Sequence, residues 1–313
     1  MKEKLLRQAA QLEKLANGSK LTRLLHSPFK YVFAIFYRSF IYKRTGKELL
    51  KDALLFFGKK MKILLPSSTD IYLVGGKSHP SETRLAKFLI RNLNEGDHFI
   101  DIGAHYGYFS ILASQLIGFG GKVFSYEPSS ESYQVLLQNS KESGNIMAFQ
   151  KAVSDINGKV VLYEFANLYS EYNTLNADQF KNTEWIRKFP PKETTVHSIT
   201  LDQLIKESES KPKIIKIDAE GAEYKILSGA INMLSGHHCI ITMEYLSPLR
   251  SNQEHKKAVT LLQQMNYDPY RIETDGSCLP IQGKDIDSYL QDNQLESDNI
   301  VFSHFDISVE SLF

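Results

Sequence analysis

The chain lacks most of the features that would assign it to a specialised structural class. Only two of its 313 residues are cysteines, Cys239 and Cys278, and they form no CxxC pair. Two cysteines are too few for a disulfide framework. Cys239 lies in the apolar run at 239–243, which favours a buried free thiol and a reducing, cytoplasmic environment.

The chain also lacks an excess of charge of either sign. It carries 37 Lys and Arg against 36 Asp and Glu, a formal net charge of +1. Proteins that hold nucleic acid usually carry a basic excess, since the phosphate backbone is strongly anionic. We therefore expect no nucleic-acid partner.

No segment is apolar and long enough to suggest a membrane span. Residues 1–25 mix Lys, Glu, Gln and Leu and lack the apolar core of a secretory signal. The apolar stretch at 28–42 is interrupted by Lys30 and Arg38 and is shorter than the roughly 20 residues that a span needs. Its aromatic and basic residues fit either a helix packed on the main domain or peripheral contact with a membrane. The expectation is a cytoplasmic protein, with peripheral attachment left open.

What the chain does contain is a regular alternation of strand and helix patterns. Residues 1–65 are expected to form an N-terminal helical extension, since apolar residues recur there at spacings of three and four. The rest, 66–313, is expected to be one α/β domain. Apolar runs predict strands at 69–74, 98–102, 122–126, 147–153, 213–218, 239–244 and 299–303. Helical patterns cover 82–93, 108–117, 130–143, 222–234 and 253–265.

Strands this apolar, separated by helices, predict a doubly wound, mostly parallel sheet covered on both faces. The stretch at about 156–200 breaks the alternation, and we expect an insertion with a hairpin at 159–165 and a loop. Loops at strand ends form the variable rim of such sites, so this insertion is the expected substrate rim. Its polar and aromatic residues could face a sugar or simply pack the loop; they are Tyr169, Tyr172, Asn173, Trp185 and Arg187.

The strongest motif follows the strand predicted at 98–102. Asp101 ends this strand, and Gly103, Ala104 and Gly107 form a turn into a helix. Glycines at such a turn let the backbone approach a ligand closely. A carboxylate here is unfavourable for a pyrophosphate but suits the ammonium and sulfonium of S-adenosylmethionine. The Gly-x-Gly-x-x-Gly pattern is absent, which disfavours a nicotinamide-dependent oxidoreductase.

Two further strand ends carry candidate cofactor ligands. Glu127 follows the strand at 122–126, where an acidic residue commonly accepts hydrogen bonds from ribose hydroxyls. Asp155 could accept a hydrogen bond from the adenine amino group, with Ser154 sharing the contact. The alternative for Asp155 is a role in starting the turn at 155–158.

A second acidic group follows the strand at 213–218. Asp218, Glu220 and Glu223 precede or begin a helix, whose dipole partly explains Glu223. A hydroxyl that accepts a methyl group loses a proton, so a base helps. Asp218 is the first candidate because a strand end opens onto the cofactor cleft, followed by Glu220 and then the histidines His105 and His197. Asp218, Glu220 and Glu244 could instead hold a divalent cation. Their spacing matches no dedicated metal loop, so we expect no metal.

Taken in chain order, these motifs resemble those of the FkbM-type methyltransferases. The resemblance covers about 80–250, and its most distinctive segment is Asp-Ala-Glu-Gly-Ala-Glu at 218–223, followed by Leu-Ser-Gly-Ala at 227–230. It implies a seven-stranded, Rossmann-like class I methyltransferase fold and S-adenosylmethionine as cofactor. It also implies that Asp101, Gly103 and Gly107 form the cofactor loop and Glu127 binds ribose. Asp218 and Glu220 would then line the active site. His105 stands where the family commonly has Asn.

The resemblance implies methyl transfer, usually to a hydroxyl oxygen. We therefore expect O-methylation of a sugar, glycolipid or other small natural product. One alternative is a non-catalytic or membrane-associated binding protein that keeps the fold, and another is N- or C-methylation. The expected partner is a small-molecule or glycan acceptor, and the sequence predicts no oligomeric state.

Overall fold

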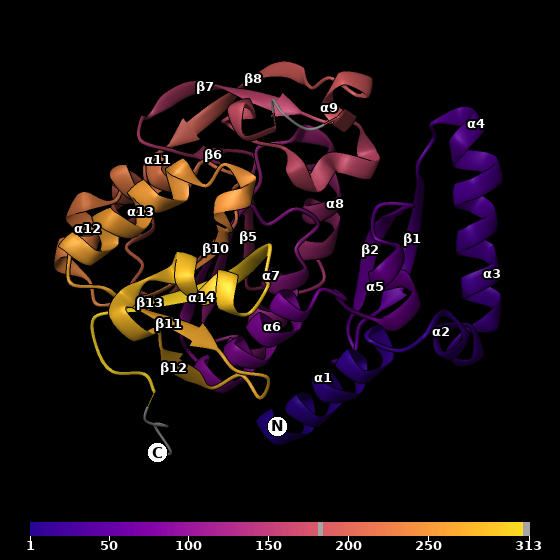
Figure 1. Cartoon of the computed structure of the whole chain (residues 1–313), viewed down its shortest axis with the longest axis horizontal. Helices are drawn as coiled ribbons and strands as arrows, with labels where there is room; N and C mark the ends of the chain where they lie inside the picture. The colour runs from indigo at the N-terminus through magenta and orange to yellow at the C-terminus, as the bar shows by residue number, and fades with distance from the viewer. Residues whose placement is uncertain (181–183, 309–313) are drawn as a thin grey trace.

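The computed structural model describes residues 1–180 and 184–308 and is built around one eight-stranded sheet (Figure 1). In sheet order the strands are β12 (Cys278–Pro280), β11 (Asp268–Ile272), β13 (Ser297–Ser303), β10 (Ile240–Leu246), β9 (Pro212–Ile217), β3 (His98–Ile102), β4 (Lys122–Tyr126) and β5 (Ile146–Phe149). The strands from β10 to β5 are parallel, and β13 runs antiparallel to β10. This confirms the mostly parallel, doubly wound sheet, and the short edge strand β12 extends the expected seven strands to eight.

Helices cover both faces of this sheet (Figure 1). Their bounds are α6 (Pro80–Asn92), α7 (Tyr108–Ile117), α8 (Ser130–Ser140), α10 (Leu201–Ser208), α11 (Glu223–Ser228), α12 (Ile231–Gly236), α13 (Gln253–Gln264) and α14 (Ile286–Asp292). Successive residues of β3 serve opposite faces, as strand geometry requires. Phe99 packs in the core beneath α6 and α7, and Ile100 packs in the core beneath α10 to α14.

The N-terminal region is only partly the helical extension that the sequence predicts. The helices are α1 (Lys2–Ala16), α2 (Lys20–His26), α3 (Pro28–Phe36), the π-helix η1 (Tyr37–Tyr42) and α4 (Lys43–Thr45). An antiparallel hairpin follows, formed by β1 (Leu49–Leu54) and β2 (Lys60–Leu65). The prediction of a helical extension over residues 1–65 is therefore wrong for the hairpin. Gly58, with φ +85°, supplies its turn, and alternate residues of β1 face inward.

The strand predicted at 69–74 is also wrong, because these residues form the short helix α5 (Thr69–Val74). A short apolar run does not by itself distinguish a strand from a buried helix. Here Asp70 accepts a hydrogen bond from the backbone N–H of Ile71 at the start of the helix. Gly75, with φ +79°, ends it in the left-handed conformation that glycine adopts easily.

Two predicted elements are each divided in the structure. The strand expected at 147–153 becomes β5 and the separate β6 (Ala152–Val153), which joins β7 (Gly158–Glu164) and β8 (Lys192–Ile199) in a second sheet. The helix expected at 222–234 breaks between α11 and α12. At the break, a Cβ on Gly229 would lie 2.3 Å from the carbonyl oxygen of Ser154, so the chain there passes close to the end of β6.

The insertion predicted at 156–200 begins and ends in strands of this second sheet. All seven residues of β7 pair with β8, from Gly158 with Ser198 to Glu164 with Lys192, so the hairpin expected at 159–165 is formed by β7 with the more distant β8. The segment between them carries the 3-10 helices η2 (Asn167–Tyr172) and η3 (Ala177–Phe180) and the helix α9 (Glu184–Lys188).

Candidate active site

A cavity of about 410 Å³ opens at the carboxyl ends of the central parallel strands. Gly103 follows β3, Glu127 follows β4 and Asp218 follows β9, and all three line it. Glu244 of β10 completes this edge. Open α/β sheets bind ligands at this edge, where the strand order reverses. The volume lies within the roughly 300–1,000 Å³ typical of small-molecule sites.

The glycine turn after β3 forms one wall of the cavity. Gly103 has φ +72° and lines the cavity, while Gly107, with φ +88°, caps the start of α7 behind it. Ala104 is buried and does not line the cavity. The backbone N–H groups of Gly103 and Ala104 both donate to the carbonyl of Tyr126. These bonds fix the turn against the end of β4.

Asp101 lies behind this wall, with 1% of its surface exposed. One of its oxygens accepts a hydrogen bond from Ser110 at 2.6 Å, and the other lies 3.3 Å from the ammonium of Lys216. That ammonium also lies 3.2 Å from Asp218. Burial alone would lower the pKa of Lys216, but the carboxylates of Asp218 and Asp101 raise it above its usual value. Asp101 is therefore linked to Asp218 at the cavity edge by the buried, charged Lys216. The sequence analysis missed this lysine.

Glu127 faces the cavity, although only 5% of its surface is exposed. Its two carboxylate oxygens accept hydrogen bonds from the backbone N–H groups of His105 and Ser129, each at 2.9 Å. Burial raises its pKa to about 7. Each oxygen of a carboxylate can accept a second hydrogen bond, so Glu127 retains sites for two hydroxyl donors.

Ser154 and Asp155 follow β6, and the sequence predicts that they contact the adenine of the cofactor. Ser154 is buried and donates a hydrogen bond to Asp155 at 2.9 Å, while Asp155 itself is exposed. Neither lines the cavity, whereas Lys151, Ala152 and Val153 just before them do. The adenine contact of Asp155 and Ser154 stays a prediction.

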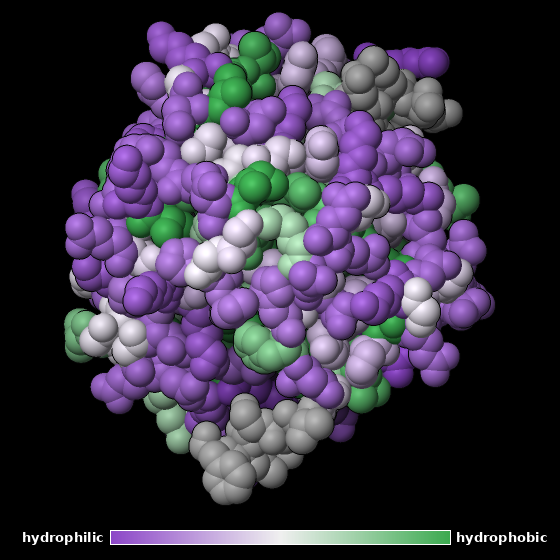
Figure 2. Space-filling view, turned by 90° about the vertical axis from the view of Figure 1, so that its left-hand side faces the viewer, coloured by the Kyte–Doolittle hydropathy of each residue, from purple (hydrophilic) through white to green (hydrophobic). Residues whose placement is uncertain are grey.

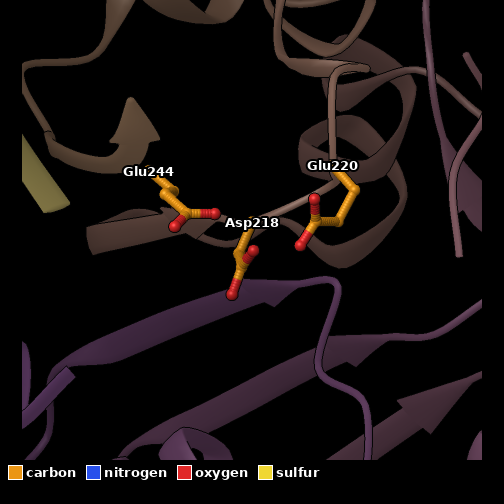
Figure 3. A group of neighbouring side chains, drawn as sticks. All are labelled: Asp218, Glu220 and Glu244. Carbon is orange, nitrogen blue, oxygen red and sulfur yellow. The ribbon is translucent and has the colours of Figure 1, made fainter. Parts of the chain in front are cut away.

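Three carboxylates meet where the ends of β9 and β10 line the cavity (Figure 3). Asp218, Glu220 and Glu244 each offer one oxygen, and these oxygens lie within 4.8 Å of one another. Burial, followed by the charge of Glu244, raises the pKa of Glu220 well above its usual value. Burial, followed by the charge of Asp218, raises the pKa of Glu244 to about 8. The group can therefore exchange protons near neutral pH, and its oxygens are also ligands that hard cations accept.

Two residues of the strand-end loops adopt backbone conformations that are uncommon outside glycine. Glu220 has φ +48° and His105 has φ +49°, and both line the cavity. Such outliers persist where the surrounding structure holds them. Thr174 donates to the carbonyl of Glu220 at 2.5 Å, and Ser170 lies 3.2 Å from the Nε2 atom of His105. The insertion therefore holds both loops.

The two histidines considered as bases differ in position. His105 stacks on Tyr106 with the ring centroids 3.7 Å apart, and burial lowers its pKa to about 4. Its imidazole is therefore neutral at pH 7 and a weak proton acceptor. His197 lies exposed on β8 and does not line the cavity.

The insertion forms one rim of the cavity. Tyr172 and Asn173 line it, whereas Tyr169 and Arg187 do not, and the side chain of Trp185 lies outside the described part of the chain. An ion pair fastens this rim to the main domain, because Lys77 lies 2.6 Å from Glu171 and 3.0 Å from Glu82. The sequence analysis did not identify Lys77. Its one local signal is the preceding turn at 75–76.

Acidic groups outnumber basic ones around the cavity. The acids are Glu82, Glu127, Glu171, Asp218, Glu220, Glu244 and Glu296. The lysines and arginine are Lys77, Lys151 and Arg250. Acids gathered on one concave surface favour a cationic ligand. The residues present therefore fit S-adenosylmethionine, which carries an ammonium and a sulfonium.

The large, mostly parallel sheet with helices on both faces is the fold of a class I methyltransferase. A family model described as the methyltransferase FkbM domain matches residues 101–269. The chain belongs to this family and uses S-adenosylmethionine as its cofactor.

The chain is also similar to individual methyltransferases. The chain is 24% identical over 162 residues to the hexuronic acid methyltransferase AglP of Haloferax volcanii, a match that covers 51% of this chain and 61% of that protein. A solved FkbM methyltransferase from Methylobacillus flagellatus is 14% identical, with a TM-score of 0.43, over 76% of this chain and 52% of that one. An O-methyltransferase from Bacillus cereus, solved in complex with S-adenosylhomocysteine, is 12% identical, with a TM-score of 0.39, over 72% of this chain and 80% of that one.

Proposed function

We propose that this methyltransferase transfers its methyl group to a hydroxyl oxygen of a sugar, glycolipid or other small natural product. The observation that carries the proposal is the group of three carboxylates at the cavity edge, two of which have raised pKa values. A hydroxyl must lose a proton as its oxygen is methylated, and a base with a pKa near the working pH accepts it best.

Glu127 is the proposed ribose ligand, because it faces the cavity with free acceptor sites on both oxygens. The bound cofactor supplies a methyl group on a positively charged sulfur. Gly103 lets the backbone turn lie against the ligand, and Asp101 acts through Lys216 rather than by direct contact. The acid-rich lining of the cavity favours the positive charges of the cofactor's sulfonium and ammonium groups.

Glu220 is the proposed general base. The sequence favours Asp218, but the carboxylate of Asp218 is already engaged in an ion pair with the ammonium of Lys216 at 3.2 Å. Glu220 has a raised pKa, and its loop is held by Thr174. In this proposal the proton of the acceptor hydroxyl passes to the carboxylate of Glu220. His105 is too weak a base for this role.

The acceptor is proposed to bind between the carboxylate group and the insertion. Tyr172 and Asn173 offer an aromatic face and an amide there, which suits the mixed apolar and polar surface of a sugar. Arg250 also lines the cavity and offers its guanidinium as a local partner for a carboxylate of the acceptor. A hexuronic acid, which the name of the relative AglP specifies, is an acceptor of this kind.

The test is transfer of labelled methyl from S-adenosylmethionine to a panel of neutral sugars, uronic acids and glycolipids, with the product identified by mass spectrometry and NMR. The proposal expects methyl on oxygen, with uronic acids or their conjugates preferred over neutral sugars. Methyl found on nitrogen or carbon would overturn it. Cofactor binding without transfer to any acceptor class would favour the non-catalytic alternative.

A further inference from the structure

The N-terminal helices present one covered face and one open face. Toward the protein, Ala34 and Tyr37 are buried, and Phe33 packs against the main core. The hydroxyl of Tyr37 donates to the carbonyl of Lys47 at 2.7 Å, and Phe33 contacts Tyr72 of α5. This face therefore fixes α3 and η1 on the rest of the protein, at the edge of the molecule (Figure 1).

The opposite face of these helices is apolar and exposed. Its exposed apolar residues are Leu21, Leu25, Phe29, Val32, Ile35, Phe36, Phe40 and Ile41. Phe29 is 91% exposed, and Phe36 stacks on Phe40 with ring centroids 5.3 Å apart. Within the segment 28–42, Phe29, Val32, Phe36 and Phe40 recur at spacings of three and four, which places them along one side. A continuous apolar stripe of this kind marks an interaction surface.

The charges around this stripe have one sign. Between Glu13 and Glu48 the chain has no acidic residue and eight basic ones, Lys14, Lys20, Arg23, Lys30, Arg38, Lys43, Arg44 and Lys47. Within residues 1–180 and 184–308, none of the eight forms an ion pair. The whole chain is nearly neutral, so this basic concentration is local.

We propose that the open face of α2, α3 and η1 docks on the anionic surface of a lipid bilayer. Aromatic side chains beside lysines and arginines are the composition of helices that lie in the membrane interface. No helix in the described part of the chain is long and apolar enough to span a membrane, so the contact is peripheral. A second copy would bring the same basic face against itself in a symmetric interface, which like charges oppose.

The side of the molecule shown in Figure 2 has a different character. Hydrophilic residues prevail there, and hydrophobic ones lie in small groups between them.

Phe119, in the turn after α7, is 92% exposed and lies outside the basic segment between Glu13 and Glu48. It therefore provides a matched control for the loss of one exposed aromatic side chain.

The experiment is flotation of the full chain with vesicles of phosphatidylcholine alone, or mixed with phosphatidylserine or phosphatidylglycerol. The proposal expects binding to the anionic vesicles that weakens with salt and is lost on neutral ones. Phe29→Ser with Phe36→Ser, and separately Lys43→Gln with Arg44→Gln, should each lower the partition coefficient on the order of tenfold or more. Phe119→Ser should leave it unchanged. All these side chains are exposed, and binding of S-adenosylhomocysteine reports whether the variants stay folded.

Three results would overturn the proposal. One is no binding to anionic vesicles by the folded protein. The second is binding that survives both double variants or falls equally with Phe119→Ser. The third is a dimer in sedimentation velocity that dissociates in the Phe29 and Phe36 variant, without vesicle binding. None of these readouts depends on methyl transfer, so the proposal stands or falls separately from the proposed acceptor.

Discussion

The backbone of Gly103 lies against the backbone of Asp218, so closely that a Cβ on Gly103 would be 1.7 Å from the carbonyl oxygen of Asp218. The turn after β3 and the turn after β9 are therefore packed against each other. Glycine is needed at this position for two reasons: it has no Cβ to obstruct the close approach, and it readily adopts the φ of +72°. The contact holds the strand-end turn that contains Gly103 and the strand-end turn that contains Asp218 together.

Replacing Gly103 with alanine should consequently destabilise the protein by roughly 3–5 kcal/mol, because the new methyl group meets backbone atoms that cannot move aside. Urea unfolding measures this loss. Gly58→Ala is the control, since Gly58 has φ +85° in the hairpin turn but no atom lies within 4 Å of the place that a Cβ would take there. It should cost only about 1–2 kcal/mol, from backbone strain alone. Equal losses in the two variants would contradict the packing argument.

Glu127 should contribute directly to cofactor affinity. Removing its carboxylate in Glu127→Ala takes away two charge-assisted acceptors, so the dissociation constant for S-adenosylhomocysteine should rise by at least about tenfold. Calorimetric titration measures it. Asp292→Ala removes an exposed carboxylate on α14, and its affinity should equal that of the wild type. Wild-type affinity in folded Glu127→Ala protein would remove Glu127 from the site.

The stability of the protein without cofactor should fall as pH rises from about 5 to 8.5. Burial raises the pKa values of Glu127 and Glu244 to about 7 and about 8, above the value of about 4.3 expected in the unfolded chain. The folded state therefore binds more protons in this window, and its advantage is lost as pH passes through these values. The urea midpoint should be lower at pH 8.5 than at pH 5.5, and Glu244→Gln should flatten this dependence. A midpoint that rises with pH would contradict the raised pKa values.

Turnover should depend on Glu220 more than on any other carboxylate of the group. Glu220→Gln keeps the shape of the side chain but cannot accept the proton, so kcat should fall by roughly 10²- to 10⁴-fold with little change in cofactor affinity. In the wild type, kcat should rise with pH as the base loses its proton, and this rise should lie above the pH range in which an ordinary glutamate titrates. A Glu220→Gln enzyme with wild-type kcat and an unchanged pH profile would exclude Glu220 as the base. The same measurements on Asp218→Asn would then decide whether Asp218 takes the role.

Much of the site was predictable because the carboxyl ends of parallel strands share one edge of a sheet. That geometry alone predicts that Gly103, Glu127 and Asp218 lie near one another. It does not predict Lys216 as the partner of Asp101, which requires the pairing of two strands far apart in the chain. In the structure Asp101 and Lys216 lie opposite each other in β3 and β9. A lysine within the apolar strand 212–217 is the local signal that a buried carboxylate must lie nearby.

Local patterns failed where short apolar runs fit more than one structure. The hairpin formed by β1 and β2 and the short helix α5 are both built from six-residue elements whose type is decided by packing. The acid-rich lining could not be foreseen in full either. Lys77 and Glu171 come from segments that contact only in the folded chain, where their ion pair joins the insertion to the main domain.

The central claim is that the acid-rich cavity binds S-adenosylmethionine, and calorimetric titration with S-adenosylhomocysteine tests it most directly, with NAD as the control ligand. The account predicts one-to-one binding of S-adenosylhomocysteine with a dissociation constant on the order of micromolar, which corresponds to a binding free energy of about −8 kcal/mol. It predicts no heat with NAD. Binding of NAD, or no binding of S-adenosylhomocysteine by a demonstrably folded sample, would contradict it.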